Sequence, residues 1–205
     1  QFGMSAVFGS QAGLTIPEIS LFIAMFYIGS VVTQYPIGWF SDRMDRRVVI
    51  FTVSAFATAG AAVGLLFPGS YTLLLVAAFV VGGATNPLYS LLIAHANDFL
   101  SREDMASASA GLLFVNGCGA VLGPIAIGWL MTNLGTSAYF LFLGVLTGIM
   151  GLYTMYRMTK RAAPSVEETG SFAPVLPTST SVAMEAAQEY AQYSIDEEAE
   201  SQSAS

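Results

Sequence analysis

The stretch ISLFIAMFYIGSVVTQYPIGWFSDRMDRR, residues Ile19–Arg47, decides the fold class of this chain. Its first part, Ile19–Phe40, contains no Asp, Glu, Lys or Arg, whereas the residues that follow it carry three arginines. An apolar run of about 20 residues is long enough to cross a bilayer as a helix, and Lys and Arg cluster in the loops on the cytoplasmic side of a membrane. The stretch therefore predicts a membrane-spanning helix that ends in a basic loop.

Four more apolar runs of spanning length follow. The predicted spans are Ile19–Phe40, Val48–Phe67, Tyr71–Ala96, Met105–Thr132 and Ala138–Arg157. Hydrocarbon accommodates only helices or closed barrels, and these runs lack the alternating pattern of barrel strands. Only 10% of the residues are charged, against about 25% in soluble domains. We therefore expect an all-α membrane protein, a transmembrane helix bundle over residues 1–161 with five complete spans and the lipid bilayer as its surroundings.

The basic residues give this bundle an orientation. All seven can be placed on one side of the membrane: Arg43, Arg46, Arg47, Arg102, Arg157, Lys160 and Arg161. The connections that would lie on the other side, Phe67–Ser70 and Asn133–Ser137, carry no Lys or Arg. This pattern predicts that the basic loops and the C-terminal tail are cytoplasmic and that the start of the chain lies outside.

The formal net charge of −7 belongs to the tail and not to the bundle. After Arg161 the chain has eight acidic residues and no basic one, whereas the residues up to Arg161 carry a net charge of +1. We interpret residues 162–205 as an acidic, disordered tail, because their composition buries too little apolar area to offset the entropy of ordering. No basic stripe interleaved with aromatic residues suggests a nucleic-acid partner. The single cysteine, Cys118, excludes an internal disulfide and a Cys-rich metal site, and we expect neither a metal nor a cofactor.

The most specific motif follows the first span directly. Gly38-Trp39-Phe40-Ser41-Asp42-Arg43-Met44-Asp45-Arg46-Arg47 resembles the signature loop of the major facilitator superfamily, G-x-x-x-D-R-x-G-R-R. Five of the six specified positions match, and Asp45 stands in place of the inner glycine. Because Asp tolerates a left-handed backbone better than most residues, we expect the turn to survive this replacement. A basic loop that only sets topology is the alternative interpretation.

The resemblance implies a fold and a partner. Members of that superfamily have two six-helix halves, built from inverted three-helix repeats, with the substrate bound near the midplane. The five spans would correspond to helices eight to twelve, and the short apolar segment Gln1–Gly13 to the outer end of helix seven. The chain would then be most of the C-terminal half, truncated at its N-terminus, and its missing partner would be the N-terminal half. A bacterial inner membrane is the location that the resemblance suggests.

The same resemblance assigns roles to the residues of the loop. Gly38 would permit close helix contact, and the three arginines Arg43, Arg46 and Arg47 would anchor to anionic headgroups and to neighbouring carboxylates. Asp42 would face the N-terminus of a helix in the other half, so we expect it to have no natural partner within this chain. Contacts of this kind would break and re-form as two bundles rock.

A second motif lies in the fourth span, where Gly119-x-x-x-Gly123 precedes Pro124. It is similar to the Gly-Pro motif of the fifth helix in the antiporter branches of the superfamily. Small residues four apart allow two helices to approach closely in lipid, and a proline inside a helix bends it. We expect packing at Gly119 and Gly123 and a kink at Pro124. The pairs Gly60/Gly64 and Gly144/Gly148 show the same spacing and predict further close contacts.

No charged residue lies in the middle of any span, so this chain offers no obvious proton-coupling carboxylate. The uncharged polar residues that we expect to line a cavity are Tyr27, Gln34, Asn86, Tyr89 and Asn116. Such a lining suits a neutral or amphipathic solute. Hydrogen bonding between helices is an equally open interpretation for each of these residues.

The sequence bears on three classes of function. The first is a secondary active transporter that moves a small organic solute by alternating access. The second, a membrane enzyme, needs a nucleophile with a base, paired aspartates or metal ligands; the chain has one histidine, His95, near a membrane edge and no acid at the midplane. The third is a non-transporting membrane sensor or assembly subunit built on half of the superfamily's bundle. The sequence favours the transporter and leaves the third class open.

Overall fold

The computed structural model describes residues 2–97 and 105–160 of the chain. The described residues form helices and short connections: α1 (Phe2–Gln11), α2 (Ile16–Ser41), α3 (Arg46–Leu66), α4 (Tyr71–Asn97), α5 (Met105–Leu134) and α6 (Ala138–Lys160). The five long helices are each long and apolar enough to cross a membrane. They confirm the five predicted spans, and every predicted end lies within three residues of the observed one. The predicted tail, residues 162–205, lies outside the described residues, as do Arg102 and Arg161.

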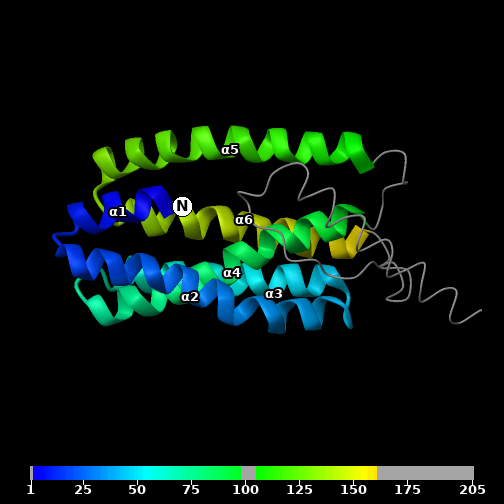
Figure 1. Ribbon diagram of the computed structural model, residues 1–205, viewed down its shortest axis with the longest axis horizontal. Helices are drawn as coiled ribbons and strands as arrows, with labels where there is room; N and C mark the ends of the chain where they lie inside the picture. Colours follow the sequence, from blue (N-terminus) through cyan, green and yellow to red (C-terminus); the bar gives the residue numbers. More distant parts are fainter. Residues whose placement is uncertain (1, 98–104, 161–205) are drawn as a thin grey trace, which may run out of the picture.

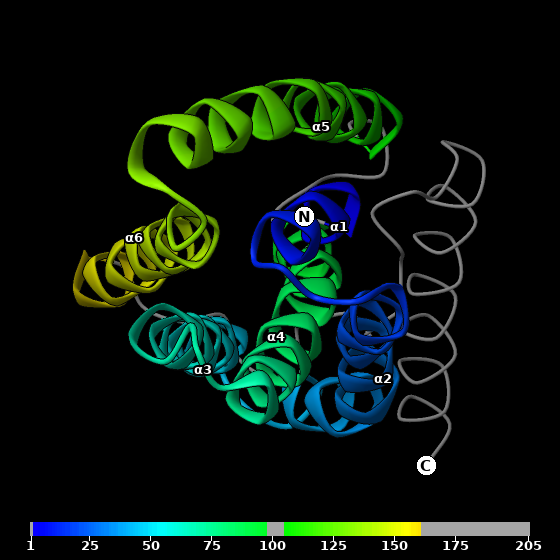
Figure 2. The ribbon, with the colours of Figure 1, turned by 90° about the vertical axis from the view of Figure 1, so that its left-hand side faces the viewer.

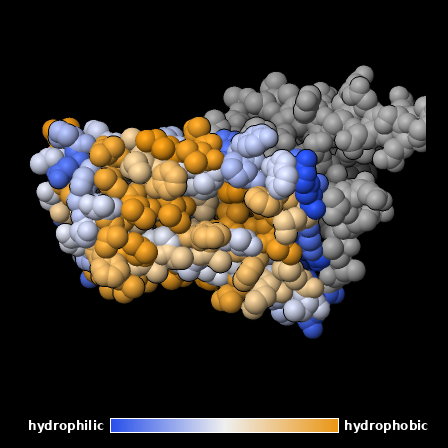
Figure 3. Space-filling model, turned by 90° about the horizontal axis from the view of Figure 1, so that it is seen from below, coloured by the Kyte–Doolittle hydropathy of each residue, from blue (hydrophilic) through white to orange (hydrophobic). Residues whose placement is uncertain are grey.

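Successive long helices run in opposite directions, so their ends gather at two ends of the bundle (Figure 1). One end, called the basic end below, contains the last turns of α2, α4 and α6 and the first turns of α3 and α5. Five basic residues lie there: Arg43, Arg46, Arg47, Arg157 and Lys160. In Figure 3, apolar residues cover most of one face of the bundle, and the strongly hydrophilic residues gather at its two ends. This distribution is the one that a membrane-spanning bundle requires.

Local signals explain where the helices begin and end. Thr15 precedes α2, and its backbone N–H and its hydroxyl both donate to Glu18 Oε2, at 2.8 and 2.7 Å. Pro17 lies in the first turn, where its missing N–H costs nothing. Gly135, at φ 84°, ends α5 in the left-handed conformation that favours glycine. The hydrogen bonds from Thr15 to Glu18 belong to the capping box that an S/T-x-x-E pattern indicates.

Helix α4 forms the centre of the bundle. About 67% of its apolar span is buried inside the chain, and α2 and α3 pack along it, with α6 against α3 (Figure 2). Helix α5 lies at the opposite extreme, because only 6% of its span is buried. It contacts the rest near its two ends, through Leu112 and Leu113 against Ile93 and through Ile127 and Met131 in the main core.

The closest helix contact is the crossing of α2 with α4. A Cβ atom on Gly29 would collide with the carbonyl oxygen of Phe79 and lie 2.9 Å from its carbonyl carbon, and one on Gly82 would collide with the backbone of Phe26. The hydroxyl of Thr33 lies between the carbonyl oxygens of Gly29, at 2.9 Å, and of Gly83 on α4. The chain therefore crosses here at a separation that only glycine allows.

Two of the three predicted glycine pairs also mediate packing. A Cβ on Gly60 would lie 2.8 Å from Val80, and one on Gly64 would lie 2.6 Å from the ring of Phe140. Gly144 faces Ala61 at 3.3 Å across the contact between α3 and α6, where the hydroxyls of Thr58 and Thr147 lie 3.0 Å apart. The third pair behaves differently: Cβ atoms on Gly119 and Gly123 would meet nothing within 4 Å. Gly119 and Gly123 therefore make no close contact with the described helices, because α5 stands away from its neighbours, and close packing at this pair stays a prediction.

Candidate functional site

The loop between α2 and α3 is built by hydrogen bonds to the ends of both helices. Asp42 ends α2, and its N–H donates to the carbonyl oxygen of Gly38 at 3.1 Å. The backbone N–H groups of Arg43 and Met44 donate to the carbonyl oxygen of Phe40, at 3.1 and 3.0 Å. The backbone of the loop is therefore an extension of the helix end, and it places the side chains of Asp42 to Asp45 at the basic end of the bundle.

Asp45 caps the next helix. Its φ of −53° and ψ of 113° are not left-handed, and its Oδ1 accepts from the backbone N–H of Arg47 at 3.0 Å. The prediction of a tolerated left-handed turn at this position is therefore wrong. An acidic residue directly before a helix satisfies an orphan N–H and complements the helix dipole. An aspartate directly before a helical run is the sequence signal for such a cap.

Asp45 also binds the side chain of Arg47. Arg47 Nε donates to Oδ1 at 3.1 Å and Nη2 to Oδ2 at 3.0 Å, which makes a forked ion pair. Partial burial alone would raise the pKa of Asp45, but the hydrogen bonds from Arg47, together with the charges of Arg47 and the nearby His95, lower it below its ordinary value. The carboxylate of Asp45 is therefore held ionised by its neighbours.

Arg46 and Arg47 lie inside the protein and not among headgroups. They are 3% and 8% exposed. Arg46 Nε donates to the hydroxyl of Ser41 at 3.1 Å, which is itself fully buried. The expected contact with carboxylates is confirmed for both arginines, by Asp45 and more distantly by Asp42, whereas their anchoring to anionic headgroups is wrong because their guanidinium groups are covered.

Asp42 has a partner in this chain, contrary to the expectation. Its Oδ1 lies 4.0 Å from Arg46 Nη2, and its side chain is 37% exposed. The distance is at the outer limit of an ion pair, and the carboxylate is exposed although Arg46 is covered, so this pair is held less tightly than the forked pair of Asp45 and Arg47. The Asp42–Arg46 contact is thus the weak one of the loop, and the Asp45–Arg47 contact is the strong one.

Arg43 is the exposed arginine of the loop. Its guanidinium carbon lies 4.3 Å from the centroid of the Trp39 ring, and Nη1 donates to the Trp39 carbonyl oxygen at 3.3 Å. Such a cation–π contact orients the side chain at the surface. Sequence reasoning missed Trp39 and Ser41 as partners; the spacing of four residues between Trp39 and Arg43 is the signal that could have found the former.

One face of α2 gathers four of the predicted residues. Gln34, Gly38, Asp42 and Arg43 line a shallow groove of about 430 Å³, together with Val31, Tyr35 and Trp39. Tyr27 lies two turns from Gln34 on the same face and is 52% exposed. The groove is polar at the basic end and becomes apolar towards the middle of the span.

The other predicted residues lie on α4 and α5. Asn86 is buried in α4 one residue before Pro87, and the helix continues through that proline. Tyr89 packs against Ile93, as do Leu112 and Leu113 of α5, and the buried hydroxyl of Tyr89 has no hydrogen-bond partner among the described residues. Asn116 is half-buried one turn further along α5. The structure thus brings Tyr89 and α5 together, while α2 lies on a different side of α4 (Figure 2).

Pro124 lies within a helix that stays continuous from Met105 to Leu134. A kink at this residue stays a prediction. Around it, Val121, Leu122 and Ile125 are all more than 60% exposed. Helix α5 therefore presents a broad apolar surface interrupted by Gly117, Gly119 and Gly123.

Comparison with known proteins gives a consistent result. The sequence profile of the Major Facilitator Superfamily matches residues 2–191. The chain is similar to the MFS-type transporter YfkF of Bacillus subtilis, with 26% identity over 143 residues, which cover 69% of this chain and 36% of YfkF. It is also similar to the MFS-type transporter YcaD of Escherichia coli, with 24% identity over 142 residues and the same two coverages. The chain thus spans little more than a third of the length of these relatives.

A solved structure shares the fold. The crystal structure of an auto-inhibited POT family peptide transporter superimposes with a TM-score of 0.68 at 18% sequence identity. The match covers 80% of this chain and 35% of the transporter. At this identity the likeness concerns the arrangement of the helices alone.

Proposed function

Because the chain belongs to the major facilitator superfamily, we propose that it forms part of a secondary active transporter that moves a small organic solute by alternating access. The observation that carries this proposal is the exposed groove on α2. It places Gln34 inside a membrane span and continues to Asp42 and Arg43 at the basic end. A polar side chain within a span is costly unless it faces a cavity or a partner, so this face of α2 suits the wall of a solute pathway.

The uncharged lining restricts the class of solute. Tyr27 and Gln34 on α2, Asn86 and Tyr89 on α4 and Asn116 on α5 supply hydroxyl and amide groups without a formal charge. The orphan hydroxyl of Tyr89 is a group that a solute could satisfy. We infer a neutral or amphipathic solute that is held by hydrogen bonds and by aromatic surface.

Alternating access needs a contact that breaks and re-forms, and the loop between α2 and α3 offers one. The Asp42–Arg46 pair is long and joins an exposed carboxylate to a covered guanidinium, whereas the Asp45–Arg47 pair is forked and partly buried. We assign the exchangeable role to Asp42 and a fixed, helix-capping role to Asp45. In this scheme, the loop keeps its shape while the carboxylate of Asp42 changes partners.

A transport pathway needs a second bundle opposite the polar faces of α2 and α5. The open space at Gly119 and Gly123 leaves room for a helix of that bundle to approach closely. We propose that a second half-transporter packs there, from the same or another chain. By the distribution of arginines, the basic end faces the cytoplasm, and a bacterial inner membrane is the proposed location.

A substrate-independent experiment tests alternating access. In a Cys118→Ala background, Gln34→Cys is labelled with a membrane-impermeant maleimide from each side of sealed vesicles that contain the full-length transporter. We expect labelling from both sides. Asp42→Asn should change the ratio of the two labelling rates, because it destabilises one of the two access states, inward-open or outward-open. Ile149→Cys, at the exposed surface of α6, is the matched control that should be labelled from neither side.

Uptake measurements complete the test. Proteoliposomes are assayed with radiolabelled neutral and amphipathic solutes, and Gln34→Ala and Asn116→Ala are compared with Ile149→Ala. Loss of uptake in the first two variants alone supports the assignment. Labelling of Gln34→Cys from one side only, together with no uptake of any solute by folded protein, would count against a transporter.

A further inference from the structure

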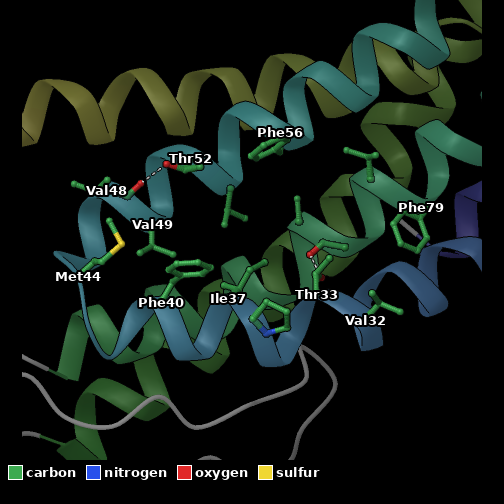
Figure 4. A pocket seen from close by; sticks show the side chains of 15 residues that line it. Val32, Thr33, Ile37, Phe40, Met44, Val48, Val49, Thr52, Phe56 and Phe79 are labelled. Carbon is green, nitrogen blue, oxygen red and sulfur yellow. Dashed lines mark hydrogen bonds between the residues drawn. The ribbon is translucent and has the colours of Figure 1, made fainter.

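We propose that a second groove, between α2 and α3, binds one acyl chain of an anionic membrane phospholipid, with its phosphate at Arg43. The groove has a volume of about 570 Å³ and is floored by α4. Its lining side chains form a row from Phe79 and Val32 to Met44, with Phe40 and Ile37 on one wall (Figure 4). This volume lies in the range of small-ligand pockets, about 300–1,000 Å³, so part of a lipid fits where a whole lipid does not.

The chemistry of the lining selects hydrocarbon. Thr33 and Thr52 carry the side-chain hydroxyls of the groove, and both donate to carbonyl oxygens of their own helices: Thr33 to Gly29 at 2.9 Å and Thr52 to Val48 at 2.8 Å. The remaining lining side chains are apolar. Because both hydroxyl protons are engaged, a polar solute would lose its hydration here and find only the two hydroxyl oxygens of these side chains as acceptors. An acyl chain has no such loss.

The position of the groove connects it with the membrane and not with the proposed solute pathway. Both of its walls are membrane spans, so its mouth opens at the depth of the hydrocarbon layer. On α2, the groove residues Val32 and Pro36 lie on the face opposite to Gln34, because a helix turns about 100° per residue. The acyl-chain groove is therefore a separate surface from the one that carries Gln34, and the two meet only at the basic end, where Arg43 lines the polar groove.

Charge at the basic end identifies the headgroup. The ring of Phe40, which lines the groove, meets the ring of Trp39 edge-on with centroids 5.0 Å apart. Arg43 lies over that Trp39 ring at 4.3 Å. Arg46 and Arg47 are covered, so Arg43 is the loop arginine that is exposed beside the groove. An exposed guanidinium at the membrane surface binds phosphate through directed hydrogen bonds, and a chain in the groove would bring a phosphate within its reach.

Photolabelling tests the acyl chain. The full chain is reconstituted into phosphatidylcholine vesicles with trace phosphatidylglycerol that carries a diazirine halfway along one acyl chain. After irradiation, labelled peptides are mapped. We expect higher labelling over Val32–Phe56 than over the exposed α6 stretch Val145–Tyr156, and competition by unlabelled phosphatidylglycerol. Thr52→Trp should reduce the groove labelling by filling it, whereas Val145→Trp should leave it unchanged.

A charge variant tests the headgroup. Unlabelled phosphatidylglycerol should compete for the groove label better than phosphatidylcholine does, and the ratio of the two effects is the competitive advantage. Arg43→Gln should reduce this ratio about fivefold, the contribution of one basic residue near an anionic surface. Lys160→Gln, at the same end of the bundle, is the matched control that should leave the advantage intact. Thermal unfolding verifies that each variant is folded. Equal labelling of the two regions would overturn the proposal in favour of unspecific boundary lipid, and an unchanged advantage in Arg43→Gln would overturn the assignment of the headgroup.

Discussion

Asp45 illustrates how one residue changes the role of a whole motif. The signature of the superfamily has glycine at this position, and this chain uses the replacement as a helix cap and as the partner of Arg47. Arg46 and Arg47 lie in the first turn of α3, at the positive end of the helix dipole, where positive charges are unfavourable. The carboxylate of Asp45 offsets this repulsion, and the burial of Arg47 depends on it.

Replacement of Asp45 should therefore destabilise the bundle. Asp45→Ala removes the cap and takes the carboxylate of the forked ion pair away from the buried Arg47; loss of the cap alone costs about 1 kcal/mol. Asp45→Asn keeps an oxygen that can accept from the N–H of Arg47 and should cost less than Asp45→Ala. The measurement is thermal unfolding in detergent, followed by the fluorescence of Trp39 and Trp129. Equal melting temperatures for the wild type and Asp45→Ala would contradict the cap.

The pKa of Asp45 predicts a dependence on acid. Its pKa is lower in the folded protein than in an unfolded chain, so its ionised form stabilises the fold fully above the unfolded value, about pH 4. This stabilisation disappears as the pH falls through the lower, folded value. The melting temperature of the wild type should therefore drop more between pH 6 and pH 3 than that of Asp45→Asn. Parallel pH profiles would show that Asp45 does not contribute.

At the scale of the elements, the spacing of helices is set by where glycines meet. Gly29 and Gly82 bring the backbones of α2 and α4 together, while Gly119 and Gly123 on α5 meet open space. Both sets occur in apolar runs of similar composition. The difference arises from which helix faces the residue.

A pair of glycine substitutions measures this difference. Gly29→Ala should destabilise the bundle by about 1–3 kcal/mol, because its methyl group collides with the backbone of Phe79 and neither helix can yield by a side-chain rotation. Gly117→Ala, whose Cβ has nothing within 4 Å, is the control. It should be neutral or stabilising by up to about 1 kcal/mol, since alanine favours a helix over glycine. Equilibrium unfolding in mixed micelles gives both values, and equal effects would refute the crossing.

At the scale of the whole molecule, the five spans place all described basic residues at one end. This arrangement arises because the basic residues follow the first span or end the fifth, and successive spans run in opposite directions. It implies that Met44 and Lys160 lie on one side of the membrane and Gly69, in the connection of α3 with α4, on the other.

Cysteine labelling examines this topology. In the Cys118→Ala background, Met44→Cys and Lys160→Cys should react with an impermeant maleimide from the same side of oriented vesicles, and Gly69→Cys from the other. All three positions are exposed in the structure, so a lack of reaction would not result from burial in the protein. Reaction of Met44→Cys and Gly69→Cys from the same side would contradict five spans.

The number, type and limits of the long helices follow from the amino-acid sequence alone. Apolar length, a cap at Thr15 and breaks such as Phe67–Ser70 act locally. In a bilayer, the backbone of an apolar run satisfies its own hydrogen bonds by forming a helix. The motif Gly38–Arg47 likewise indicated the family. These signals depend on neighbours along the chain, and for that reason they could be read without knowledge of the fold.

Only the tertiary structure decided which residues meet. It showed that Arg46 and Arg47 are covered while Arg43 is exposed, that Gly29 is crowded while Gly119 is open, and that opposite faces of α2 form a polar groove and an apolar one. Lipid is as apolar as the helix surfaces, so hydropathy does not tell a buried face from a lipid-facing one. The choice depends on close packing between residues far apart in the chain, which the order of the residues does not display.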